Sequence, residues 1–196
     1  MKKDFISADT VRNNALQLAK RIYDDGFIPD IIYVSLRGGA FLGNIISEFF
    51  KIINPNEKPV FYAAVVARSY MNIQQQECVQ IDGWTYSPNY LRSGDRVLFV
   101  DDIYDTGKTI SYLADCVMAK GLPREHIKIA VHDYKRSAIE KQTPIQPDYW
   151  CRELKTDGTW IHYLSHELEG LSAEEIQQYY LNPYPELNEV FSALFP

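Results

Sequence analysis

The chain has 196 residues, of which 46% are hydrophobic and 23% are charged, a composition that is typical of one soluble globular domain. Its formal net charge of −6 argues against a broad electrostatic surface for nucleic acid. No apolar run is long enough to span a membrane, and the first residues lead into no signal-peptide core. The three cysteines, Cys78, Cys116 and Cys151, have neither a disulfide nor a metal spacing. We therefore expect a cytoplasmic protein without nucleic-acid or membrane partners.

The first third of the chain contains a strand, a glycine-rich loop and a helix in succession. Ser7 or Asp9 can cap a helix that ends near Gly26. The apolar run 31–36 then predicts a buried strand, and a second helix is expected from 40 to about 51. Between them lies Arg37-Gly38-Gly39. Alone this is an ordinary turn, but glycine amides and an arginine also suit a phosphate.

A polar stretch follows the next predicted strand, which covers 60–67. Ser69 and Tyr70 open this stretch, which continues from 71 to 82 with few apolar residues. A polar segment of this length between two strands predicts either a surface hairpin or a mobile lid.

The most informative stretch is 97–109. Four apolar residues predict a buried strand, two adjacent carboxylates follow, and the segment Asp-Thr-Gly-Lys-Thr leads into a helix. A loop at a helix N-terminus offers free amides and the positive end of the helix dipole to a phosphate. Carboxylates at this place would repel a phosphate unless sugar hydroxyls or hydrated Mg²⁺ lie between them. The implied ligand is a phosphorylated sugar with free vicinal hydroxyls.

Two other phosphate motifs do not fit. A Walker A loop that ends in Gly107-Lys108-Thr109 needs glycine at 102, where this chain has Asp102. The segment 38–43 comes near the dinucleotide-binding pattern G-x-G-x-x-G but misses it. His162 and His166 are four residues apart, yet no zinc motif accompanies them.

The stretch 97–109 resembles the PRPP-binding motif of type I phosphoribosyltransferases. The resemblance implies an α/β fold, with a twisted, mainly parallel sheet flanked by helices and a small hood formed by the C-terminal part. It places a core at about 5–135 and a base-binding hood with a C-terminal extension at about 136–196 of a single domain. It also implies a homodimer or homotetramer.

By this resemblance, each part of PRPP has its own contacts. Asp101 and Asp102 would hold the ribose hydroxyls directly or through Mg²⁺. The loop with Arg37, Gly38 and Gly39 would contact the pyrophosphate, and Ser69-Tyr70 matches a pair on the closing loop of 6-oxopurine enzymes. The contacts expected for the 5′-phosphate come from Asp105, Thr106, Gly107, Lys108 and Thr109.

The purine branch of the family supplies the remaining expectations. Lys135 would donate to the 6-oxo group of the base, Trp160 would stack on the ring, and the backbone of Ile161 would read the base edge. Without the resemblance, the sequence would indicate that Lys135 is a solvated surface lysine and that Trp160 is an aromatic residue of the core. The family commonly continues with Pro-Trp-Glu, where this chain has Leu-Ser-His-Glu at 164–167.

The resulting hypothesis is an enzyme of purine salvage that transfers the phosphoribosyl group of PRPP to hypoxanthine, guanine or xanthine and releases pyrophosphate. Asp105 would be its catalytic residue, taking the proton from N7 of the base or holding it during transfer. The sequence does not rank the three bases. The alternatives are a PRPP-binding regulator of the same fold and a phosphoribosyltransferase for another base.

Overall fold

The computed structural model describes residues 2–53, 58–71, 77–136, 145–155 and 158–194, and of 68–71, 77, 78 and 194 only the backbone. A six-stranded sheet forms the body, in the order β4-β3-β2-β5-β6-β7. All neighbours are parallel except β3 and β4, which form an antiparallel hairpin. The strands of this sheet are β2 (Ile31–Leu36), β3 (Phe61–Met71), β4 (Glu77–Trp84), β5 (Val97–Tyr104), β6 (Ile127–Lys135) and β7 (Tyr149–Leu154). The expected α/β class and mainly parallel sheet are confirmed.

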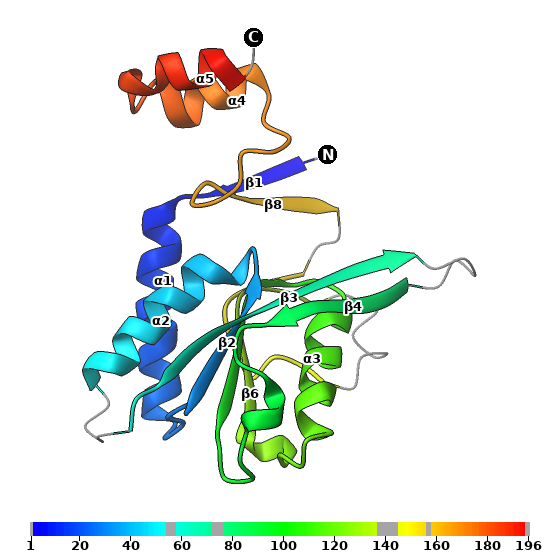
Figure 1. Cartoon of the computed structure of the whole chain (residues 1–196). Coiled ribbons are helices and arrows are strands. Elements are labelled where there is room, and N and C mark those ends of the chain that lie inside the picture. The colour runs from blue at the N-terminus through cyan, green and yellow to red at the C-terminus, as the bar shows by residue number, and fades with distance from the viewer. Residues whose placement is uncertain (1, 54–57, 72–76, 137–144, 156–157, 195–196) are drawn as a thin grey trace.

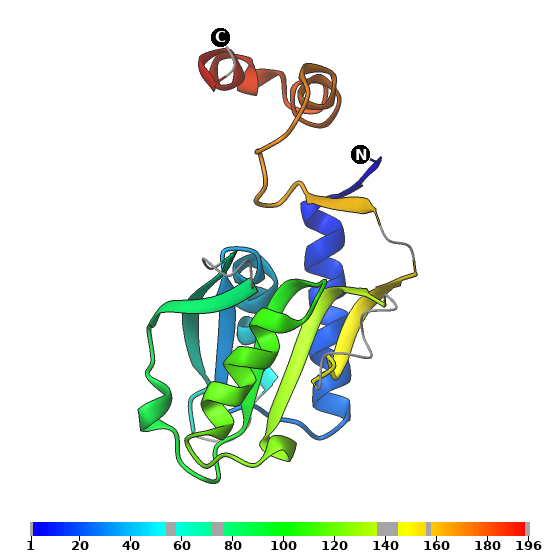
Figure 2. The ribbon, with the colours of Figure 1, turned by 90° about the vertical axis from the view of Figure 1, so that its right-hand side faces the viewer.

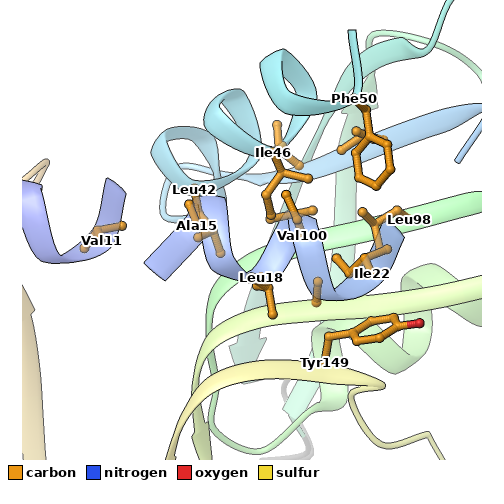
Figure 3. Close-up of a cluster of buried hydrophobic side chains, with 14 of the residues drawn as sticks. Val11, Ala15, Leu18, Ile22, Leu42, Ile46, Phe50, Leu98, Val100 and Tyr149 are labelled. Atoms are coloured by element: carbon orange, nitrogen blue, oxygen red, sulfur yellow. The ribbon is translucent and has the colours of Figure 1, made fainter. Parts of the chain in front are cut away.

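Helices cover both faces of this sheet (Figures 1 and 2). The helices α1 (Ala8–Asp24) and α2 (Gly39–Ile53) pack on one face, and α3 (Lys108–Met118) packs on the other. Successive residues of β5 supply the two cores in turn, because side chains alternate along a strand. Leu98 and Val100 belong to the core with α1 and α2, as Figure 3 shows, whereas Val97 and Phe99 belong to the core with α3.

Local signals explain where these helices begin. Ser7 is the N-cap of α1, and its side chain accepts a hydrogen bond from the Thr10 amide. Gly107 is the N-cap of α3 and lies in the left-handed conformation. Both helices therefore start where the sequence predicts.

A second, two-stranded parallel sheet consists of β1 (Lys2–Ile6) and β8 (Thr159–Tyr163). It lies near the N-terminal end of α1, and the C-terminal helices lie beyond it (Figure 1). These are α4 (Ala173–Ile176), a π-helical turn at Gln177–Leu181, and α5 (Asn188–Leu194). Single 3₁₀ turns occur at Pro88–Tyr90, Arg124–His126 and Pro185–Leu187.

The structure corrects the expected boundary of the hood. β7 falls within 136–196 but is the edge strand of the main sheet, so the core extends beyond 135. Conversely, β1 comes from the N-terminus and pairs with β8. Below, the hood means β1, β8 and the turn 164–170. The sequence analysis assigned no element to residues 2–6, since a short strand whose partner lies more than 150 residues away leaves no local pattern.

None of the helices in the described ranges is long and apolar enough to cross a bilayer.

Candidate functional site

The acidic pair occupies the carboxyl-terminal half of β5. The Asp101 carboxylate accepts a hydrogen bond of 3.0 Å from the Asp102 amide, and Ser35 of the adjacent strand β2 also bonds to it. Burial, together with the neighbouring charge of Asp102, raises the pKa of Asp101 well above its ordinary value. A ligand that brings hydroxyl donors or a cation would stabilise two partly buried carboxylates in this position.

The glycine loop after β2 lies directly against this pair. A Cβ atom at Gly38 would come closer than 3.0 Å to the Asp102 carboxyl group, and one at Gly39 would overlap the backbone carbonyl of Val100. Only glycines allow the two loops to approach this closely. The peptide bond between Leu36 and Arg37 is cis. The two loops singled out from the sequence therefore meet at one edge of the sheet. Loops that follow the carboxyl ends of adjacent parallel strands meet in this way at a topological switch point.

The loop between β5 and α3 encloses a small cavity. Gly107 has a φ of 71°, and a Cβ atom there would overlap the Tyr104 ring. The cavity measures about 120 Å³ and is lined by Asp101, Thr109, Ile110 and Val131 together with residues 103–107. It lies beside the N-terminus of α3, the end of a helix at which backbone amides and the helix dipole favour an anion. The volume and the donors suit a phosphate group.

A larger cavity of about 1000 Å³ joins the glycine loop to the hood. Its lining includes Arg37, Gly38, Asp102 and Trp160, and the turn 166–170 completes it. Trp160 is 50% exposed, so its ring is available to a flat ligand rather than part of a core. The Ile161 side chain is instead 5% exposed and packs in the core with α1 and α2, while its backbone lies in β8 opposite Asp4.

Lys135 and Asp105 form an ion pair across the ends of β6 and β5. The distance from Lys135 Nζ to Asp105 Oδ2 is 3.0 Å. The Lys135 side chain is only 15% exposed and the Asp105 side chain 60% exposed. Lys135 therefore lies beside the loop that follows β5, and most of the Asp105 side chain stays exposed. The proposed contact of Lys135 with a base stays a prediction.

Ser69 and Tyr70 are only partly described. Their backbone lies in β3, opposite Val79 and Cys78 of β4, so this stretch begins as a hairpin. Their side chains, like residues 72–76, lie outside the described part of the chain. The proposed contacts of this pair stay a prediction.

Three residues for which the sequence predicts no role in the site line the large cavity or contact Asp102. His166 Nε2 lies 3.4 Å from Asp102 Oδ2, and the hydroxyl of Tyr163 donates to the Asp102 carbonyl at 3.0 Å. Lys3 of β1 lines the cavity and pairs with Glu175 at 2.5 Å. No local motif marks them, because each contact joins parts of the chain that are far apart in sequence.

The acidic pair could share a divalent cation with a substrate. In the described ranges, no group of three or more His, Cys, Asp or Glu side chains is arranged to hold a metal ion. Mg²⁺ commonly takes one or two protein carboxylates and completes its shell with substrate oxygens and water. The close approach of Gly38 leaves the Asp102 carboxylate facing the cavity where such a substrate would lie, so the donor set fits.

Residues 7–164 match the family model described as "Phosphoribosyl transferase domain". The chain belongs to this family. As a member of this family, the chain is a glycosyltransferase-type enzyme. PRPP and a base are the substrates of the family. The acidic pair and the smaller cavity lie within the matched residues, whereas the larger cavity also includes Lys3 and the turn 166–170, which lie outside them.

Solved structures of phosphoribosyltransferases share the fold. The chain is similar to a purine phosphoribosyltransferase from Pyrococcus horikoshii, with a TM-score of 0.66, 23% identity, and coverage of 88% of this chain and 99% of that one. It is also similar to a Neisseria gonorrhoeae protein solved with bound ppGpp, with a TM-score of 0.67, 21% identity, and coverage of 86% and 91%. For the Helicobacter pylori xanthine-guanine-hypoxanthine phosphoribosyltransferase the values are 0.60, 17%, 82% and 90%. No curated protein matches the chain in sequence.

Proposed function

We propose that this phosphoribosyltransferase transfers the phosphoribosyl group of PRPP to a 6-oxopurine base. The observation that carries the proposal is the cavity of about 1000 Å³ that places Arg37, Asp102 and Trp160 around one space. An arginine for pyrophosphate, a carboxylate for ribose and an aromatic face for a purine are the groups that the two substrates require. The name of the Pyrococcus protein supports a purine, and that of the Helicobacter protein supports the 6-oxopurines xanthine, guanine and hypoxanthine.

The reaction breaks the bond between C1 of ribose and the pyrophosphate oxygen and forms a bond from C1 to a ring nitrogen of the purine. Positive charge develops on the ribose ring, so the protein must hold the ring and the leaving group in place. Asp101 and Asp102 would bind the ribose hydroxyls, and the cavity at 105–109 would bind the 5′-phosphate. Mg²⁺ held by the same two carboxylates would supply charge neutralisation to the pyrophosphate.

The Lys135–Asp105 pair suits the base side of the reaction. A 6-oxo group and N7 lie on one edge of a purine, where the oxygen accepts a hydrogen bond and the nitrogen releases a proton. An ammonium group and a carboxylate 3.0 Å apart match those two needs. Lys135 would therefore read the oxo group while Asp105 takes the proton from N7.

Lys135→Gln is expected to raise KM for the purine by about 10- to 100-fold, the value of one hydrogen bond to a charged group. KM for PRPP should change little, because Lys135 does not line the phosphate cavity. Steady-state kinetics with each substrate varied in turn measure both constants. Lys120→Gln, on an exposed turn after α3, is the matched control. Equal changes in the two KM values would remove Lys135 from base recognition.

The test of the function is pyrophosphate release from PRPP and Mg²⁺ with hypoxanthine, guanine, xanthine, adenine or orotate. We expect turnover with at least one of the three oxopurines. Turnover with adenine or orotate alone would assign the enzyme to another base. PRPP binding without turnover on any base would favour a regulator of the same fold.

A further inference from the structure

Tyr163 lies on β8, the strand that carries Trp160, and contacts Asp102 of β5. It lies at the end of β8, three residues after Trp160, and is 2% exposed. Its hydroxyl oxygen lies 3.0 Å from the backbone carbonyl oxygen of Asp102 and 2.6 Å from Asp133 Oδ2, and its single proton is shared between these two acceptors. One side chain thus joins the strand that carries the base-stacking Trp160 to the residue that would hold the ribose.

The hydroxyl is fixed by a buried ionised carboxylate. Asp133 is 0% exposed and accepts from Arg152 Nε at 2.6 Å, while His132 Nδ1 lies 2.7 Å away. Burial alone would raise the pKa of Asp133, but the hydrogen bonds from His132, Arg152 and Tyr163 outweigh it and hold the pKa below its ordinary value. Charge-assisted hydrogen bonds of this kind are short and directional. Asp133 therefore sets the position of the Tyr163 hydroxyl.

The same network reaches the other strand of the hood. Arg152 on β7 donates through Nη1 to Asp4 of β1 at 3.1 Å. Asp4 is the register partner of Ile161 on β8. The hood is thus attached to the main sheet through Asp133, at a point next to the acidic pair, since Asp133 is itself the register partner of Ile103.

We propose that Tyr163 is a positioning residue, whose hydroxyl couples β8 and its Trp160 to the backbone of Asp102. This rests on the proposed function, because it assigns Trp160 to the base and Asp102 to the ribose. The coupling keeps the purine in line with C1, and an error of about 1 Å in such alignment can cost on the order of 100-fold in rate. The ring of Tyr163 also stacks on His166, with centroids 5.3 Å apart and an angle of 17°.

Tyr163→Phe isolates the hydroxyl, because the ring and its contact with His166 remain. Asp133 keeps its hydrogen bond from Arg152 and its contact with His132, so the variant is expected to fold. Tyr180→Phe is the matched control. The Tyr180 hydroxyl also shares its proton between two backbone carbonyls, those of Leu164 at 3.4 Å and Glu167 at 3.2 Å, but it does not contact Asp102.

In the kinetic arm, Tyr163→Phe should lower kcat and raise KM for the purine by about tenfold each, with Kd for PRPP changed by less than about twofold. Tyr180→Phe should leave all three values near those of the wild type. A purely structural role would lower the active fraction and leave every KM unchanged, which would overturn the proposal.

The second arm does not depend on turnover. Amide hydrogen exchange is followed in β8 and in the loop 105–109, with and without PRPP and Mg²⁺. We expect PRPP to protect the loop in all three proteins, and to protect β8 in the wild type and Tyr180→Phe but not in Tyr163→Phe. Equal protection of β8 in Tyr163→Phe would refute the coupling. Loss of oxopurine turnover in the wild type, with the exchange pattern as expected, would instead refute only the proposed function.

Discussion

Asp105→Asn is expected to lower kcat by about 10²- to 10⁴-fold, the usual contribution of a positioned general base. The Asp105 side chain is 60% exposed, and Lys135 Nζ lies 3.0 Å from its carboxylate. Asparagine preserves the shape of the side chain but has no basic oxygen to take the proton from the purine. Because the amides of the loop 105–109 remain, Kd for PRPP should change by only a few-fold.

Single-turnover kinetics and direct titration of PRPP separate these two quantities. The control is Asp115→Asn, which removes a carboxylate of the same size from the exposed side of α3 and should leave both quantities unchanged. If PRPP affinity and kcat fall by the same factor, Asp105 acts in binding and the proton acceptor lies elsewhere.

Gly107→Ala is expected to weaken PRPP binding by more than about tenfold and to destabilise the fold. A left-handed residue other than glycine costs about 1–2 kcal/mol, and Gly107 has a φ of 71°. The added Cβ atom would also overlap the Tyr104 ring. That ring has little room to move, since it is 2% exposed and its hydroxyl donates to the Ile145 carbonyl at 2.6 Å. The loop must therefore shift, and with it the amides that face the phosphate.

Chemical denaturation and PRPP titration measure the two effects. Gly26→Ala is the matched control, because Gly26 has a similar φ of 75° but no atom within 4 Å of an added Cβ. It should show the backbone cost of about 1 kcal/mol without any change in PRPP affinity. If the two variants lose the same stability and bind PRPP equally well, the contact with Tyr104 does not shape the loop.

Elements with a local chemical signal could be predicted from the sequence. The apolar runs 31–36 and 97–100, each followed by a short polar loop and a helix, correctly indicated two strand-loop-helix units on a parallel sheet. The loop 105–109 was equally visible as a candidate phosphate site, because glycine, hydroxyl residues and a lysine at a helix start have few other uses in that order. The meeting of this loop region with Arg37-Gly38-Gly39 followed from the rule that parallel strands present their carboxyl ends at one edge.

The order of the strands and the attachments of the hood were decided by the tertiary structure. β1 and β8 are short, and they pair because the fold brings two distant regions of the chain together. β7 joins the main sheet beside β6 through backbone hydrogen bonds that carry no sequence pattern.

The sequence by itself determined the fold class and the family of this protein and located the loops proposed to bind phosphate, since all of these depend on residues that are neighbours in the chain. The tertiary structure alone decided which side chains join the two halves of the site. Tyr163 and Asp102 are 61 residues apart, and Lys135 and Asp105 are 30 apart. A hydrogen bond at such separation depends on the positions of whole strands, which are set by the packing of both cores and not by any local run of residues.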